Sequence, residues 1–218
     1  MKLFVVIAML SAASLPAVRA QQPAPKPPDH MQHRFDDPAR FAKSFDDPAR
    51  DQWQLPERVI AALGLKPDAA VADVGAGTGY FSMRLARAVP AGTVYAVDIE
   101  PNMVAHLKTR AAGEKAANVT AVLASPTSPN LPKPVDLILV VDTYHHIGNR
   151  PEYFRALRSA LGPGGRIAII DFRKDAPDGP PAHFRFTPEQ IKAEMKQAGY
   201  LPEAEHDFLP RQHFIIFR

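Results

Sequence analysis

Three glycines and an aspartate form the group of residues in this chain that says most about chemistry. Asp73 interrupts an apolar run and is followed by Gly75, Gly77 and Gly79, after which the sequence has the composition of a helix. Glycine allows the backbone to adopt positive φ and to come close to a ligand. The first N–H groups of a helix attract a carboxylate or a phosphate. The spacing therefore predicts a strand, a tight turn and a helix start that bind a nucleotide-like ligand, although an ordinary glycine-rich turn has a similar composition.

The spacing of these glycines separates two classes of nucleotide cofactor. A dinucleotide-binding fingerprint has its third glycine three positions after the second, and here that position is Tyr80. An acid followed by Gly-x-Gly-x-Gly instead resembles the first motif of the class I S-adenosylmethionine-dependent methyltransferases. The resemblance implies that the turn surrounds the methionine part of S-adenosylmethionine. It also implies that Asp73 orients the turn's backbone or the cofactor's amino group.

A second acid follows at the distance that such folds require. Asp98 ends the next predicted strand, 19 positions after Gly79. A carboxylate at this place can accept two hydrogen bonds from a ribose diol, and in the methyltransferases it binds the ribose hydroxyls. We include the adjacent Ile99 in the predicted cofactor site. Asp98 could also cap the helix that begins near Pro101, and the two roles are compatible.

A third group of polar residues follows the fourth predicted strand. Ligands of open parallel sheets bind beyond the carboxyl ends of the strands, and here Asp142, Tyr144, His145 and His146 follow such an end. Many small-molecule methyltransferases carry a similar His-His pair. Methyl transfer from a sulfonium needs alignment and removal of a proton from the acceptor, which suits a histidine. We expect His145 as general base, Asp142 to orient acceptor or cofactor, Tyr144 as a wall or hydrogen-bond donor, and His146 to pack into the domain.

Three further segments have less defined roles. Many relatives end the third strand with an acid that recognises adenine, whereas this chain has Ser125 nearby, which we include as a cofactor contact. Asp171 ends the fifth strand and could cap the loop that follows. The Pro/Gly-rich loop 174–186 either faces the substrate or connects elements at the surface. His30 and His33 have no partners at metal-site spacing, so no metal site is predicted.

The elements that must position these residues alternate between strand and helix. Apolar runs that are nearly continuous, as in parallel strands buried on both faces, predict strands at 70–74, 93–98, 119–124, 135–141 and 166–171, with a closing strand at 213–217. Helices are expected from Pro56, closed by Gly64, from Pro151, closed by Gly162, and from a capping box at Thr187. The resemblance implies an α/β, Rossmann-like, doubly wound domain over residues 56–218. Its mostly parallel seven-stranded sheet would have helices on both faces and an antiparallel last strand.

A hexapeptide is duplicated before this domain. Phe-Asp-Asp-Pro-Ala-Arg occurs at 35–40 and again at 45–50. Each copy has an aspartate suited to an N-cap and a proline suited to the first helical position. We therefore predict a short helical N-terminal extension over residues 35–55. It is either a lid over the cofactor and substrate mouth or an arm packed on the side of the domain.

The N-terminus has the pattern of an export signal. Lys2 precedes an apolar stretch, and Val18-Arg19-Ala20 has small residues where signal peptidase requires them. Residues 1–20 are predicted to be a signal peptide cleaved after Ala20, which would place the protein in the periplasm without stable membrane association. An uncleaved membrane anchor is the alternative. Residues 21–34, rich in proline and glutamine, are predicted to be a disordered linker.

Composition excludes several classes of function. The chain has 218 residues and a formal charge of +3, of which +2 belongs to residues 1–20, and it has no basic run that would bind nucleic acid. It contains no cysteine, so disulfides and thiol catalysis are excluded. The sequence thus predicts an S-adenosylmethionine-dependent methyltransferase acting on a small molecule. An NAD-dependent oxidoreductase and an exported, non-catalytic binding protein with the same fold are the alternatives, and the oligomeric state is not predicted.

Overall fold

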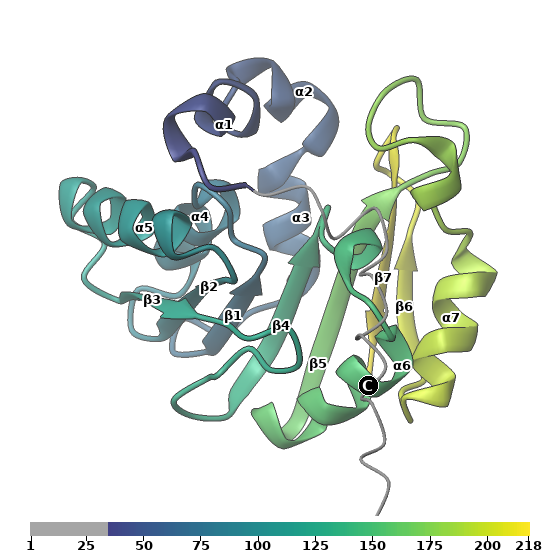
Figure 1. The fold of residues 1–218 in the computed structure, drawn as a ribbon. Helices are drawn as coiled ribbons and strands as arrows, with labels where there is room; N and C mark the ends of the chain where they lie inside the picture. The colour runs from purple at the N-terminus through teal and green to yellow at the C-terminus, as the bar shows by residue number, and fades with distance from the viewer. Residues whose placement is uncertain (1–34) are drawn as a thin grey trace, which may run out of the picture.

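The computed structural model describes residues 35–218 (Figure 1), so the predicted signal peptide, linker and His30–His33 pair lie outside the described residues. Seven strands form one sheet in the order β3-β2-β1-β4-β5-β7-β6. They are β1 (Ala70–Val74), β2 (Thr93–Asp98), β3 (Val119–Leu123), β4 (Val135–Val141), β5 (Leu161–Phe172), β6 (Pro202–His206) and β7 (Gln212–Phe217). Strands β1 to β5 pair in parallel, whereas β7 is antiparallel to both β5 and β6. The predicted Rossmann-like sheet with its reversed last strand is confirmed.

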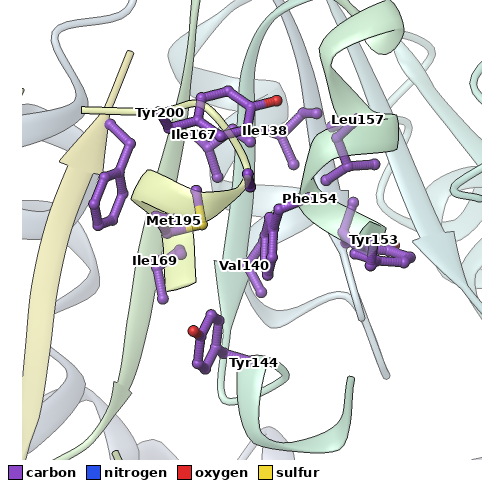
Figure 2. Close-up of a cluster of buried hydrophobic side chains, with 14 of the residues drawn as sticks. Ile138, Val140, Tyr144, Tyr153, Phe154, Leu157, Ile167, Ile169, Met195 and Tyr200 are labelled. Atoms are coloured by element: carbon purple, nitrogen blue, oxygen red, sulfur yellow. The ribbon is translucent and has the colours of Figure 1, made fainter. Parts of the chain in front are cut away.

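Both faces of the sheet are covered, as the continuous apolar runs predicted. In β4, Leu137 and Leu139 face one buried cluster, while Ile138 and Val140 face the other. Helices α3 (Pro56–Leu63), α4 (Tyr80–Ala88) and α5 (Pro101–Gly113) lie on the first side, and α6 (Arg150–Ala156) and α7 (Pro188–Gln197) on the second. Figure 2 shows the second cluster, where aromatic and aliphatic side chains of α6 and α7 pack on β4 and β5. Each such buried side chain contributes about 1.5–3 kcal/mol through removal from water.

Two of the predicted helix caps are confirmed and one is wrong among helices α3, α6 and α7. The side chain and backbone of Thr187 exchange hydrogen bonds with Gln190, so the capping box at the start of α7 is confirmed. Gly64 ends α3 with a φ of 58°. The prediction that Gly162 ends the helix after Pro151 is wrong. Helix α6 gives way to the 3₁₀-helix η4 (Leu157–Ala160), and Gly162 already lies within β5.

The duplicated hexapeptides form the predicted helix starts. Asp37 accepts a hydrogen bond from the Arg40 amide and begins α1 (Pro38–Phe45), and Asp47 accepts one from the Ala49 amide and begins the 3₁₀-helix η2 (Pro48–Arg50). A short helix, α2 (Asp51–Gln54), then leads into α3. Figure 1 places α1 and α2 over the end of the sheet to which the arrowheads of β4 and β5 point. The extension therefore covers the carboxyl edge of the sheet, which is the placement expected of a lid.

None of the helices within residues 35–218 is long and apolar enough to cross a membrane.

Candidate active site

The glycine turn after β1 adopts a backbone that only glycine tolerates well. Gly75, Gly77 and Gly79 have φ values of 78°, 54° and 96°. A Cβ added at Gly75 would lie 2.1 Å from Oγ1 of Thr143. The amide of Gly75 donates to the carbonyl of Val97 at 2.9 Å, so the turn is tied to the end of β2. The predicted turn is thus a shaped part of the carboxyl edge and not an open surface loop.

Asp73 acts on the scaffold of this turn. Its buried carboxylate accepts hydrogen bonds from the Ser82 hydroxyl, at 2.6 Å, and from the Ser82 amide. Ser82 lies in the first turn of α4, whose N-cap residue Gly79 has no side chain to accept these donors. Burial raises the pKa of Asp73 to about 6, although the bonds from Ser82 oppose the shift. Of the two roles expected for Asp73, the structure provides the one that orients the turn's backbone.

One polar group of the turn has no partner. The hydroxyl of Thr78 is buried and makes no hydrogen bond to any of the described residues. A buried hydroxyl without a partner costs free energy. A polar ligand group bound at the start of α4 would remove that cost.

Asp98 and two apolar side chains surround the end of β2. The carboxylate of Asp98 accepts from the amide of Gly77 at 2.8 Å and from that of Glu100 at 2.9 Å. The cap residue of α5 is Glu100, so Asp98 is not its N-cap. Ile99 and Leu123 are 49% and 47% exposed, and Leu123 pairs with Asp98 in the sheet register. Two exposed apolar side chains thus flank a carboxylate that retains acceptor capacity, and sequence reasoning had missed Leu123.

The hydroxyl of Ser125, which we expected to contact the cofactor, already makes a hydrogen bond within the protein. Its amide and hydroxyl both donate to the carbonyl of Ser128, at 2.8 and 3.3 Å, within a tight turn after β3. The structure therefore gives Ser125 a local structural role.

His145 and Asp171 form a buried pair at the ends of β4 and β5. Nδ1 of His145 lies 2.9 Å from both carboxylate oxygens of Asp171, and the His145 amide donates to the same group at 3.1 Å. Burial lowers the pKa of His145, but the bond to Asp171 and the nearby charges outweigh it, and the pKa lies above its usual value. With Nδ1–H donating to Asp171, Nε2 carries the lone pair. Asp171, for which the sequence offered a loop cap as one role, is thus the orienting partner of the predicted base.

The expected burial of the two histidines is reversed. His145 is 5% exposed, whereas His146, which we expected to pack into the domain, is half-buried and contacts the ring of Phe35 edge-on. Both belong to the 3₁₀-helix η3 (Tyr144–His146).

Tyr144 is removed from the site altogether. Its side chain is fully buried, its ring stacks on Phe154, and its hydroxyl donates to Glu194 of α7 (Figure 2). The prediction of Tyr144 as a wall or donor for the substrate is therefore wrong, because the hydroxyl is already engaged on the α7 side of the sheet.

Asp142 belongs to a closed ring of polar side chains. Its carboxylate accepts from Arg50 at 3.2 Å and from Gln212, Gln212 accepts from Gln54 at 2.6 Å, and Gln54 accepts from Arg50. The residue itself has a φ of 51°. Burial raises its pKa to about 6, with the charge of Arg50 opposing the shift. The ring joins the extension, the end of β4 and the start of β7.

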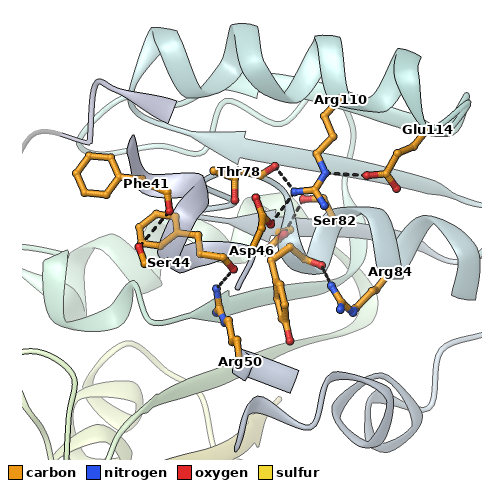
Figure 3. A network of polar contacts seen from close by, with 12 residues as sticks. Phe41, Ser44, Asp46, Arg50, Thr78, Ser82, Arg84, Arg110 and Glu114 are labelled. Carbon is orange, nitrogen blue, oxygen red and sulfur yellow. Dashed lines mark hydrogen bonds and ion pairs between the residues drawn. The ribbon is translucent and has the colours of Figure 1, made fainter. Parts of the chain in front are cut away.

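The extension also contacts the glycine turn. A Cβ at Gly77 would lie 3.2 Å from the ring of Phe45. Figure 3 shows Arg110 of α5 reaching both Asp46 in the extension, at 2.7 Å, and the carbonyl of Thr78 in the turn, at 2.9 Å. Arg110 and Gln212 belong to no motif, so sequence reasoning did not find them, and Arg50 was noted only as the last residue of the second hexapeptide. Within residues 35–218, no three His, Asp or Glu side chains are grouped so as to hold a metal ion.

Comparison with known proteins agrees with this geometry. A family model described as a methyltransferase domain matches residues 71–165. The chain is 33% identical over 141 residues to a phosphoethanolamine N-methyltransferase of Triticum aestivum and 30% identical over 135 residues to malonyl-[acyl-carrier protein] O-methyltransferase 1 of Ilyobacter polytropus. These matches cover 65% and 62% of this chain, but the chain spans 26% and 50% of those proteins.

A solved structure extends the likeness to nearly the whole described fold. An S-adenosylmethionine-dependent methyltransferase of Aquifex aeolicus superposes with a TM-score of 0.77 at 26% identity, covering 83% of this chain and 97% of that one. The residues that the family model matches include the glycine turn, Asp98 and the end of β4. Residues 71–165 therefore form a methyltransferase domain, and the described fold is that of an S-adenosylmethionine-dependent methyltransferase.

Proposed function

We propose that this protein transfers a methyl group from S-adenosylmethionine to a small-molecule acceptor. The observation that carries the proposal is the contact between the Gly77 amide and Asp98, which joins a positive-φ turn to a carboxylate at the same edge of the sheet. Ribose hydroxyls and a charged amino acid group are the ligand features that such an edge binds.

The residues present fit this cofactor. Asp98 would hold the ribose hydroxyls, Ile99 and Leu123 would flank the base, and Thr78 would give its unpartnered hydroxyl to the methionine end. When bound, S-adenosylmethionine supplies a methyl group on a sulfonium, which is already activated for displacement. The protein's own contribution is then to align the acceptor and to remove its proton.

The pair of His145 and Asp171 supplies the proton acceptor. Asp171 holds Nδ1–H, so the lone pair of Nε2 is available to an acceptor's hydroxyl or amine. The carboxylate also stabilises the imidazolium that forms. Asp142, linked to the extension through Arg50, would orient the acceptor or the cofactor.

We infer that the extension acts as a lid over this site. Phe45 lies over Gly77. Asp46 bonds Arg110 beside the glycine turn, and Arg50 bonds Asp142 beside the proposed base. Because Phe45 occupies space above the turn, the extension would move when cofactor enters or leaves.

Calorimetry on the full chain tests the proposal. S-adenosylhomocysteine should bind, and NAD should not, because Tyr80 stands where a dinucleotide site needs its third glycine. Tight NAD binding would support an oxidoreductase instead. Binding of S-adenosylhomocysteine without turnover on a broad acceptor panel would favour a non-catalytic binding protein.

Export of the protein is a separate part of the proposal. Residues 1–20 have the composition of a signal peptide, whereas S-adenosylmethionine is made in the cytoplasm. A fusion of residues 1–34 to an enzyme that is active only outside the cytoplasm tests export, and a fusion lacking residues 1–20 is the control. Activity from both fusions, or from neither, would count against a signal peptide. Retention in the membrane fraction would indicate the uncleaved anchor.

A further inference from the structure

A cavity of about 550 Å³ lies beside the proposed reaction centre. Its walls come from the extension, from the loop after β5 and from the residues before β7, and include Arg50, Trp53, Asp178 and Arg211. In Figure 1, α2 and the loop after β5 both lie beyond the carboxyl ends of the strands. The volume falls in the range of pockets that bind small molecules, roughly 300–1,000 Å³.

The cavity is on the acceptor side of the site. The glycine turn and Asp98 follow β1 and β2, whereas this cavity is next to β5 and β7. Trp53 packs on Phe172 with ring centroids 5.8 Å apart, and Phe172 directly follows Asp171. Arg50 lines the cavity and bonds Asp142. Arg50 thus connects the cavity to Asp142, and Trp53 and Phe172 connect it to the end of β5 at Asp171.

Trp53 offers a flat apolar surface with cations beside it. The guanidinium carbons of Arg50 and Arg211 lie 5.8 and 5.1 Å from its ring centroid. The side chain of Trp53 is half-buried. An aromatic ring can stack on such a surface, and that contact is worth more where an arginine also contacts the tryptophan.

The two arginines differ in their capacity to bind an anion. Arg50 is largely engaged, because it makes four hydrogen bonds, to Phe45, Gln54 and Asp142. Arg211 has one acceptor within residues 35–218, the carboxylate of Asp178, whose side chain is 57% exposed. An exposed ion pair of this kind contributes little to stability, and a guanidinium has five N–H donors. A ligand carboxylate or phosphate can therefore join or replace Asp178.

We propose that this cavity is the acceptor subsite and that it takes a flat, anionic small molecule, with the ring on Trp53 and the anion on Arg211. The proposal rests on the methyltransferase function in calling the ligand an acceptor, but the binding chemistry does not depend on it. Asp47, the other acid of the wall, already accepts from the amide of Ala49 as the cap of η2.

The chain offers a direct probe, because Trp53 is its one tryptophan. The full chain is titrated with benzoate, with its neutral amide benzamide and with acetate, which has the charge without the ring, while tryptophan emission is followed. Benzoate should produce a saturable change and bind about tenfold more tightly than either of the others, as expected for one charge-assisted hydrogen bond added to stacking. Equal affinities for benzoate and benzamide, or no saturable change, would overturn the proposal.

Two variants with opposite expected effects identify the anion site. Arg211→Gln should abolish the preference for benzoate over benzamide, whereas Asp178→Asn should strengthen benzoate binding several-fold by removing the competing carboxylate. Arg87→Gln, an exposed arginine on α4, is the matched control and should change neither. An unchanged preference in Arg211→Gln, or weaker benzoate binding in Asp178→Asn, contradicts the proposal. The second variant serves alone if the first does not fold.

Calorimetry with S-adenosylhomocysteine on the same samples separates this inference from the proposed function. Binding of S-adenosylhomocysteine without a benzoate preference would overturn the subsite alone. A benzoate preference without S-adenosylhomocysteine binding would leave the anionic site in place and remove the methyltransferase function.

Discussion

Nδ1 of His145 lies 2.9 Å from each carboxylate oxygen of Asp171, and the backbone amide of His145 donates to the same carboxylate. Asp171 lies in β5 and His145 lies in η3, just after β4, and the ends of these parallel strands are held in register by the pairing of Val141 with Ile170. A side chain and a backbone group of one residue thus bind one acid, which determines both the tautomer and the direction of the imidazole.

Asp171→Asn should lower the pKa of His145. Asp171 raises that pKa through a hydrogen bond and through its charge, and both oppose the lowering by burial. Titration of the His145 ring by NMR should give a midpoint above 6.5 in the native protein and a clearly lower one in the variant. Asp175→Asn, an exposed acid nearby, is the control.

The raised pKa of His145 makes both activity and stability depend on pH. A base must be neutral, so kcat/KM should rise with pH through the raised pKa of His145. Because the folded pKa exceeds the unfolded value, this group's contribution to stability is complete below about pH 6.5 and is lost as pH rises through the folded pKa. An activity profile that is flat from pH 6 to pH 9 would rule out His145 as the base.

Gly77→Ala should weaken cofactor binding by about tenfold or more. The φ of Gly77 is 54°, and a Cβ there would meet Phe45 above the turn, where the methionine end of the cofactor is proposed to bind. Calorimetry with S-adenosylhomocysteine measures the effect. Gly113→Ala is the matched control, because a Cβ at Gly113 meets nothing within 4 Å. Equal affinities in both variants would separate the turn from the cofactor site.

Asp73→Asn should raise stability at neutral pH relative to the native chain. Burial lifts the pKa of Asp73 from 3.8 to about 6, so the folded state loses stability as pH rises from about 4 to about 6. A shift of this size corresponds to about 3 kcal/mol, and asparagine avoids the loss while still accepting from Ser82. Urea unfolding at several pH values should show the variant's advantage growing over that interval, and a constant difference would contradict the assignment.

Tyr144→Phe should affect stability and not turnover. The side chain is fully buried and its hydroxyl donates to Glu194 of α7, so it is already engaged on the α7 side of the sheet. We expect a loss of about 1–3 kcal/mol in unfolding free energy, measured by urea denaturation, with S-adenosylhomocysteine affinity and kcat near their native values. A large fall in kcat in a stable variant would return Tyr144 to the reaction centre.

The duplication supplies a matched pair of substitutions for the lid. Asp46→Asn removes the ion pair with Arg110, whereas Asp36, at the same position of the first copy, bonds Asn102 through its backbone carbonyl and makes no side-chain hydrogen bond within residues 35–218. Hydrogen exchange over residues 36–46 should therefore rise in Asp46→Asn and stay close to native in Asp36→Asn. Equal protection in both would argue that the ion pair does not hold the extension.

The parts of the fold that sequence predicted well are those where burial alone decides. The bounds of β1, β2 and β4 agree with the predicted strands because each is an apolar run buried on both faces. The start of β5 was missed, since residues 162–165 lie in an irregularity between the pairs Val135–Leu161 and Leu137–Arg166, which no apolar pattern marks. Strand β6 is polar and exposed, so the family resemblance predicted it and its own residues did not.

The site was predicted by motif and corrected by geometry. Tyr144, His145 and His146 lie in a 3₁₀-helix, where successive side chains point about 120° apart. One of them must face the core and another the edge of the sheet, and the sequence does not say which. The bond between Arg50 and Asp142 spans 92 positions, a distance over which no local pattern carries information.

Strand β7 runs against its neighbours, so it begins at the end of the sheet that holds Gln212 and Asp142 and finishes at the other. In Figure 1 the last residue accordingly lies at the lower end of the sheet, far from α1 and α2, which cover the site. An affinity tag added after Arg218 would immobilise the protein at the side opposite the site. Binding kinetics on a sensor surface could then be measured with the site facing the bulk solution.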